Sequence, residues 1–270
     1  MGSFDTAFFN IGYLDRLSYR DTVIHRLDPR VKVITTVLFS VTVVSCPKYH
    51  VVPLIPFFAF PVLLAALSDT SFWFVMKKVL ILSPFAVFIG IFNPLFDAKT
   101  VPVAYGIAVS AGWISFLSII VKFILTISAT LILIATTSFP GVCSALRKLG
   151  VPAPFISQLL FLYRYLFVMM EETMRIVRAR DLRSFGTRGA GVTAFTGLVG
   201  TLFIRTIERA ERIYNAMLCR GFQGDIFSLK QHHFRKVDFL FMLVTTLSFA
   251  FFRFVNVAEC VGSLAQRFLV

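Results

Sequence analysis

IAVSAGWISFLSIIVKFILTISATLILIATT, residues 107–137, is the longest apolar run of this 270-residue chain and contains one charged residue, Lys122. A helix needs about 20 residues to cross a hydrocarbon core of about 30 Å. Shorter apolar runs lie at residues 31–45, 51–67, 79–96 and 239–257. The first of these is short and is expected to recruit flanking residues. Together the runs predict an all-α polytopic membrane protein with about five transmembrane helices.

The composition agrees with a membrane protein. Hydrophobic residues make up 57% of the chain and the mean hydropathy is +0.80, which exceeds the apolar content of an ordinary soluble domain. A net charge of +13 would also suit a nucleic-acid-binding protein. The basic residues, however, cluster beside the predicted spans, where they set topology and contact anionic headgroups. We therefore expect contact with membrane lipids and no nucleic-acid partner.

Basic residues are concentrated between the fourth and fifth runs. Residues 138–238 hold 15 of the 27 Lys and Arg but only 7 of the 14 Asp and Glu. The positive-inside rule places this insert in the cytoplasm. The N-terminus and the loop expected around Lys77 and Lys78 then lie inside, and the C-terminus lies outside. The first 30 residues lack the pattern of a signal peptide, in agreement with an internal N-terminus.

The chain is therefore expected to have three parts. Residues 1–137 hold the first four spans, residues 138–238 form the cytoplasmic insert, and residues 239–270 hold the fifth span and an external C-terminus. A sixth span over residues 192–204 is the alternative. That segment is short and Arg205 follows at once, so we interpret it as a helix that lies against the membrane or packs under the bundle.

Turn residues divide the insert into three helices. Pro140 opens a short helix that Gly150 closes, because proline favours the first helical position and glycine the position after the last. Pro154 opens a second helix that runs toward Gly186. A third helix ends at Gly221. Apolar residues recur every three or four positions in the second and third helices, which indicates that each buries one stripe.

Two of these helices carry a similar motif near their C-terminal ends. The motifs are RIVRARDLRSFG at residues 175–186, with Ala179-Arg180-Asp181, and NAMLCRGFQGD at residues 215–225, with Cys219-Arg220-Gly221. A cation near a helix C-terminus is stabilised by unpaired carbonyls, so ordinary capping explains either motif alone. The repetition favours docking, in which small neighbours let each guanidinium enter a groove of a partner and use its five donors there.

Several short motifs occur in a characteristic order. They are His25-Arg26-Leu27-Asp28-Pro29-Arg30 with Lys32, Thr136-Thr137, Leu149-Gly150-Val151-Pro152, Tyr163-Arg164-Tyr165 and the two arginine triplets. In this order and spacing, from about Asp15 to the last span, the chain resembles the transmembrane T component of energy-coupling-factor (ECF) transporters. Within that family it is similar to the Q-type subunit of cobalt importers.

The resemblance implies a function and a set of partners. It implies a scaffold in the bacterial inner membrane whose insert is a module of three coupling helices. It implies two ABC ATPases, as a homodimer or a heterodimer, and a substrate-binding membrane subunit. The chain would be a non-catalytic subunit that transmits ATPase motion to that subunit for cobalt uptake. Selection of cobalt, nickel or a vitamin would then reside in another chain.

The resemblance also assigns docking residues. Matched to the family, Ala179, Arg180 and Asp181 form one ATPase-docking triplet, and Cys219, Arg220 and Gly221 form the other. Two positions depart from the family pattern, in which glycine is common at Asp181 and alanine at Cys219. Both arginines stay in place, but close packing at Asp181 is less expected.

Motifs for catalysis and metal binding are sparse. The chain has no GxxxxGK[ST] loop, so ATP and Mg²⁺ are expected on the partner ATPases and no cofactor in this chain. Cys46, Cys143, Cys219 and Cys260 are scattered without a CxxC pair, which argues against a zinc site and a disulfide framework. His232-His233 are adjacent and would point apart on a regular element, so no metal site is predicted.

Two ionisable residues in or beside the spans need interpretation. Asp28 precedes Pro29 at the start of the first run, which is typical of an N-cap followed by proline rather than of a catalytic acid. Lys122 lies near the middle of residues 107–137. It either faces the bundle interior or a partner within the membrane, or two shorter helical pieces meet there and its amine reaches an interface.

The alternative function is a stand-alone membrane enzyme or carrier. One example is a lipid-phosphate transferase that uses Arg180, Asp181 and Arg183. Such a protein needs polar groups that converge within the spans, yet apart from Lys122 the apolar runs are nearly free of charge. Copurification with a pair of ATPases distinguishes the two functions.

Overall fold

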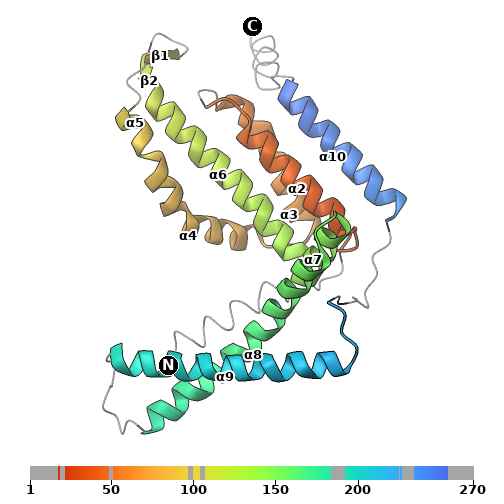
Figure 1. The fold of residues 1–270 in the computed structure, drawn as a ribbon. Coiled ribbons are helices and arrows are strands. Elements are labelled where there is room, and N and C mark those ends of the chain that lie inside the picture. The colour runs from red at the N-terminus through yellow and green to blue at the C-terminus, as the bar shows by residue number, and fades with distance from the viewer. Residues whose placement is uncertain are drawn as a thin grey trace. The chain divides into compact units, whose positions relative to one another are not determined.

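The computed structural model describes residues 18, 22–48, 51–96, 100–103, 107–183, 192–224, 226 and 234–254. The chain divides into two compact units. The bundle unit contains the described residues up to Ser138 and from Phe234 onward. The crossing-helix unit contains those from Phe139 to Ile226. Helices dominate both units, so the predicted all-α fold is confirmed (Figure 1).

The bundle unit is built around one long central helix. Its elements are α2 (Pro29–Val44), the 3₁₀ helix η1 (Val52–Phe58), α3 (Ala59–Leu67), α4 (Phe72–Gly90), α5 (Phe92–Phe96), β1 (Thr100–Val103), β2 (Ile107–Ser110), α6 (Ala111–Thr136) and α10 (Lys236–Phe254). Helix α6 packs against α2 and α4, and α10 packs against α2. Helix α2 therefore lies between α6 and α10 (Figure 1).

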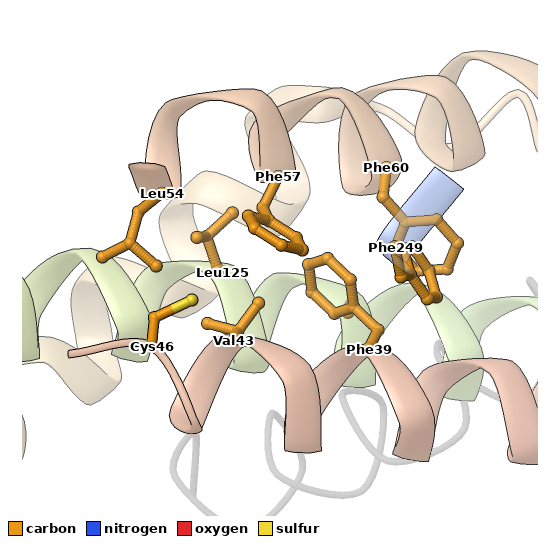
Figure 2. Packing of buried hydrophobic residues seen from close by; sticks show 9 residues of the cluster. Phe39, Val43, Cys46, Leu54, Phe57, Phe60, Leu125 and Phe249 are labelled. Carbon is orange, nitrogen blue, oxygen red and sulfur yellow. The ribbon is translucent and has the colours of Figure 1, made fainter. Parts of the chain in front are cut away.

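Aromatic rings fill the core of the bundle unit. The ring of Phe39 on α2 lies 4.6 Å from that of Phe60 on α3 and 5.4 Å from that of Phe249 on α10, measured between centroids. Phe60 and Phe249 meet edge to face at 4.9 Å, an arrangement that aromatic quadrupoles favour. Leu125 of α6 is completely buried in the same cluster (Figure 2). Four helices are thus joined by one apolar cluster.

The outer surface of the bundle unit is apolar as well. On α4, Leu80, Ile81, Phe85 and Phe88 are each at least 62% exposed. Monomeric soluble proteins rarely expose so large an apolar patch, whereas a bilayer covers it. By length and composition, four described helical segments could cross a membrane, namely Phe72–Pro94, Ala111–Thr136, Ala153–Arg183 and Lys236–Phe254.

The first two predicted runs form shorter helices than a span requires. Helix α2 has 16 residues, and the second run is divided between η1 and α3. Pro53 lies at the start of η1 and Pro56 within it, and proline removes the backbone donors that an α-helix needs. A 3₁₀ helix rises about 2.0 Å per residue, so η1 recovers part of the missing length. Five spans remain a prediction.

Two predicted boundaries in the bundle unit are wrong. The first four residues of the 107–137 run form strand β2, which pairs antiparallel with β1, and α6 begins only at Ala111. The β-branched residues of both strands suit this extended pairing. Lys77 and Lys78 lie within α4 and not in a loop, because the helix begins at Phe72. The Nζ atom of Lys78 lies over the ring of Phe74, 5.8 Å from its centroid.

The crossing-helix unit contains the three predicted helices. They are α7 (Phe139–Lys148), α8 (Ala153–Arg183) and α9 (Val192–Cys219). Residues 192–204 form the first half of α9 and are continuous with its charged second half. Helix α9 is not among the four described segments apolar enough to cross a membrane. The structure thus disagrees with a sixth span at this position.

Helix α7 ends in the motif that its sequence predicts. Gly150 has φ +102°, and its N–H donates to the carbonyl of Arg147, while the N–H of Val151 donates to that of Leu146. These two bonds form a Schellman cap. We expect Gly150→Ala to destabilise the crossing-helix unit by about 1 kcal/mol, because a Cβ disfavours positive φ. Gly150→Asn should cost less.

Denaturant unfolding of the purified chain in detergent checks this prediction. Apart from Gly150 itself and its neighbours in the chain, no atom of the described residues lies within 4 Å of the position that a Cβ on Gly150 would take, so a clash makes no contribution. Equal stability of the alanine variant and the wild type would contradict the strain argument.

Candidate functional site

Helices α8 and α9 cross near their midpoints (Figure 1). The guanidinium of Arg205 on α9 donates to the carboxylate of Glu172 on α8 at 2.6 Å. Next to this pair, the hydroxyl of Thr206 donates to the sulfur of Met169 at 3.2 Å. One ion pair and one polar contact therefore fix the crossing point, and each arginine triplet lies C-terminal to it on its own helix.

The second triplet forms the end of α9. Cys219 is the last helical residue, and Arg220 and Gly221 follow it at the surface. Gly221 has φ +76°, its N–H donates to the carbonyl of Leu218, and the N–H of Phe222 donates to that of Met217. This is a second Schellman cap. Backbone donors already satisfy two terminal carbonyls of α9, which leaves less need for Arg220 as a cap.

The segment after α9 is held against α8. The hydroxyl of Ser157 donates to the carbonyl of Gly224 at 3.0 Å, and the rings of Phe222 and Phe161 are 6.1 Å apart. A bond from Arg147 on α7 to the carbonyl of Ile226 holds the same segment farther along. The exposed Arg220 is thereby presented from a fixed position.

The first triplet lies within α8 and not at its end. Ala179, Arg180 and Asp181 are helical, and α8 continues to Arg183. Ala179 and Asp181 are exposed and Arg180 is half-buried. Arg180 lies in the last turn of α8 and Arg220 directly follows α9, so both arginines are near helix ends as predicted, but only the second triplet ends its helix. Asp181 stands where the second triplet has Gly221, and without a glycine to take positive φ the helix runs on.

The two arginines are far apart. The end of α9 lies against the first turns of α8, as the contact between Phe222 and Phe161 shows. Arg180 is 19 residues farther along α8 than Phe161. At 1.5 Å per residue the arginines are separated by on the order of 30 Å. A single small ligand cannot bridge this distance, so each arginine would contact a separate surface.

An apolar groove lies where α8 and α9 diverge. It has a volume of about 380 Å³ and is lined by Phe161, Tyr165 and Met169 of α8, by Ile213 and Met217 of α9, and by Phe222. Sequence reasoning did not identify it. The apolar stripes on α8 and α9 indicated that one face of each helix is buried. The sequence did not show that the two faces line one groove together.

Lys122 lies within a continuous helix. Helix α6 runs through it from Ala111 to Thr136, so the interpretation that two helical pieces meet there is wrong. Its amine donates to the carbonyl of Val44 at 3.1 Å and to that of Cys46. Arg253 of α10 donates to the carbonyl of Ser45 at 3.1 Å. Lys122 and Arg253 thus bind three consecutive carbonyls at the C-terminal end of α2. This end carries the negative partial charge of the helix dipole.

The candidate metal ligands and thiols of the described residues lie apart from one another. Within them, no group of three or more His, Cys, Asp and Glu side chains comes together. His232, His233 and Cys260 lie outside these residues. Cys46, Cys143 and Cys219 are free thiols. Burial raises the pKa of the Cys143 thiol, which keeps it protonated and unreactive.

Comparison with known proteins identifies the family. A family model described as "Cobalt transport protein" matches residues 20–233. The energy-coupling factor transporter transmembrane protein EcfT of Leuconostoc gelidum is 28% identical over 236 residues, which cover 80% of this chain and 86% of the relative. EcfT of Bacillus subtilis is 27% identical over 219 residues, or 75% of this chain and 82% of the relative.

A third relative carries the name of the family itself. The cobalt transport protein CbiQ of Salmonella typhimurium is 31% identical over 100 residues, which cover 37% of this chain and 44% of the relative. The family match covers most of the chain and includes both arginine triplets. This multi-pass protein of the cell membrane, related to the transmembrane components of energy-coupling factor transporters, belongs to the CbiQ family of cobalt transport proteins.

Proposed function

We propose that the chain is the coupling subunit of an ATP-driven importer of the energy-coupling factor type. In this proposal it has no catalytic site of its own. Two ABC ATPases bind its crossing-helix unit and hydrolyse ATP, and a separate membrane subunit binds the substrate. The chain transmits the motion of the ATPases to that subunit.

The distance between Arg180 and Arg220 is the observation that carries this proposal. They lie near the ends of two helices that cross once, on the order of 30 Å apart. Arg220 is exposed and Arg180 is half-buried, and the sequence neighbours of both are small or short residues. This arrangement suits two equivalent grooves on two subunits. It suits a lipid-phosphate transferase less well, because Arg180, Asp181 and Arg183 do not line the groove between the helices.

The proposed substrate is the cobalt ion, in keeping with the names of the family and of the Salmonella relative. Copurification from membranes tests the assembly, and uptake of Co²⁺ compared with Ni²⁺ tests the substrate. The expected result is a complex that contains two ATPase copies and imports Co²⁺ only when ATP is hydrolysed. A chain that purifies without ATPases and modifies a lipid phosphate by itself would overturn the proposal.

A further inference from the structure

Between residues 18 and 254 the chain leaves the bundle unit once and returns to it once, and each passage begins or ends beside a helix of the bundle unit. Helix α6 ends at Thr136, two residues before the bundle unit ends at Ser138. The described part of the bundle unit resumes at Phe234, and α10 begins at Lys236. Along the chain, motion of the crossing-helix unit therefore reaches the bundle unit at the end of α6 and at the start of α10.

The end of α6 and the start of α10, which border the two passages, are both hydrogen-bonded to the start of α2. At the start of α10, the carboxylate of Asp238 accepts from the N–H of Asp28 at 3.0 Å and from the N–H of Arg235 at 2.8 Å. At the end of α6, the amine of Lys32 donates to the carbonyl of Thr136 at 3.0 Å. Asp28 and Lys32 are one helical turn apart, so a single turn of α2 holds both passages. We name Asp28, Lys32, Thr136 and Asp238 the junction cluster.

The junction cluster is buried and its charges suit the helix ends that they contact. Asp28 and Asp238 are each 2% exposed, and Lys32 is 5% exposed. The two carboxylates lie at the N-termini of α2 and α10, and the Lys32 amine lies at the C-terminus of α6. Each charge opposes the partial charge of the helix end beside it. Buried, hydrogen-bonded charges are costly to separate, so the cluster resists displacement.

If the chain couples ATP hydrolysis to transport, the junction cluster has a role besides stabilising the fold. We propose that the junction cluster transmits the motion of the crossing-helix unit to the bundle unit, so that α2, α6 and α10 shift together when ATP is hydrolysed. This inference rests on the proposed coupling function. Asp28, Lys32 and Asp238 are positioning residues in it, since they act through the helices and not on the substrate. Helices α6 and α10 also pack on α2 through the apolar cluster around Phe39, and the junction cluster adds polar bonds at the helix ends next to the two passages.

Two variants break one passage each. In Asp238→Asn the amide offers one acceptor and one donor to two backbone N–H groups, so one of the two bonds is lost while the volume is kept. Lys32→Met removes the donors to Thr136 at similar length. Asp69→Asn is the matched control, because Asp69 is an exposed carboxylate of the bundle unit at φ +53°, which asparagine also tolerates.

The experiment uses the assembled complex of the chain with its ATPases and substrate-binding subunit. Spin-labelled unnatural amino acids at Thr130 on α6 and Leu247 on α10, both exposed, report the distance between these helices. No cysteine is replaced, so the second docking triplet stays intact. The wild type and Asp69→Asn should show a distance change on adding ATP. Asp238→Asn and Lys32→Met should lose that change while the amount of complex and ATP hydrolysis per complex stay at the wild-type level.

The possible results separate the two proposals. A distance change of wild-type size in both variants overturns the role of the junction cluster, as does the absence of any change in the wild type. Parallel loss of assembly and hydrolysis in the variants also overturns it, because the cluster then only supports folding. Failure of the wild-type chain to capture ATPases contradicts the proposed function itself and is visible before any label is measured.

Discussion

Replacement of both Arg180 and Arg220 by alanine is expected to abolish capture of the ATPases, while membrane insertion stays normal. If each guanidinium is desolvated in a groove, its removal leaves acceptors unpaired at a cost of roughly 2–5 kcal/mol per site. Each single variant should then weaken the complex by roughly 30-fold to 5,000-fold. The double variant should be worse than either, since each arginine would engage a different ATPase.

Capping predicts a different result for the same variants. A cation at a helix end contributes at most about 1 kcal/mol, and lysine supplies the charge equally well. Docking requires the planar fork of arginine, so lysine should recover only part of the function. The structure weakens capping for Arg220, because Gly221 and Phe222 already bond the last carbonyls of α9. For Arg180 capping and docking are harder to separate, because Arg183 supplies a second cation in the same last turn of α8.

The measurement is pull-down of the ATPases together with ATP hydrolysis and Co²⁺ uptake. Arg212→Ala is the matched control, because Arg212 is an exposed arginine on α9 ahead of the end of the helix. It should assemble normally. Normal assembly and uptake in the double alanine variant would return both triplets to the role of ordinary helix ends.

Much of the fold could be predicted because local signals and tertiary packing agree. Asp28 and Pro29 predicted the start of α2, and the structure has Asp28 as N-cap, with its carboxylate accepting from the N–H of Arg30 at 2.9 Å. Gly150 and Gly221 predicted two helix ends, and both have positive φ. In each case a single residue type has the backbone geometry that the position requires.

The errors arose where local signals are shared by different structures. An apolar run of β-branched residues suits both a strand and a buried helix, so the hairpin before α6 was missed. The contact of Asp238 with Asp28 joins residues 210 positions apart, and no local pattern contains it. An acidic residue three positions after Arg235 could have predicted the bond to the N–H of Arg235, since this is half of a capping box.

Lys122 shows how a long-range contact changes the meaning of a residue. From the sequence it was a cation within a span, with either a functional partner or a snorkelling role. In the structure its partners are carbonyls of the same chain, at the end of α2. We expect Lys122→Leu to destabilise the bundle unit by roughly 1–3 kcal/mol, because the part-buried carbonyl of Cys46 loses its donor. The carbonyl of Val44 is in an exposed contact and adds less. Lys122→Arg should retain most of the stability, since a guanidinium can still donate to both.

Thermal unfolding of the detergent-purified variants, followed by Co²⁺ uptake in membranes, measures both effects. Thr130→Val is the control, because it changes an exposed polar residue on the same helix without removing a contact to another helix. Arg253→Leu should cost less than Lys122→Leu, since Arg253 is exposed and, within the described residues, its bond is to the carbonyl of Ser45. The two losses should not be additive, because both side chains bind the same helix end. Unchanged stability of Lys122→Leu would mean that the end of α2 finds other donors, and that the amine at this position serves a partner within the membrane.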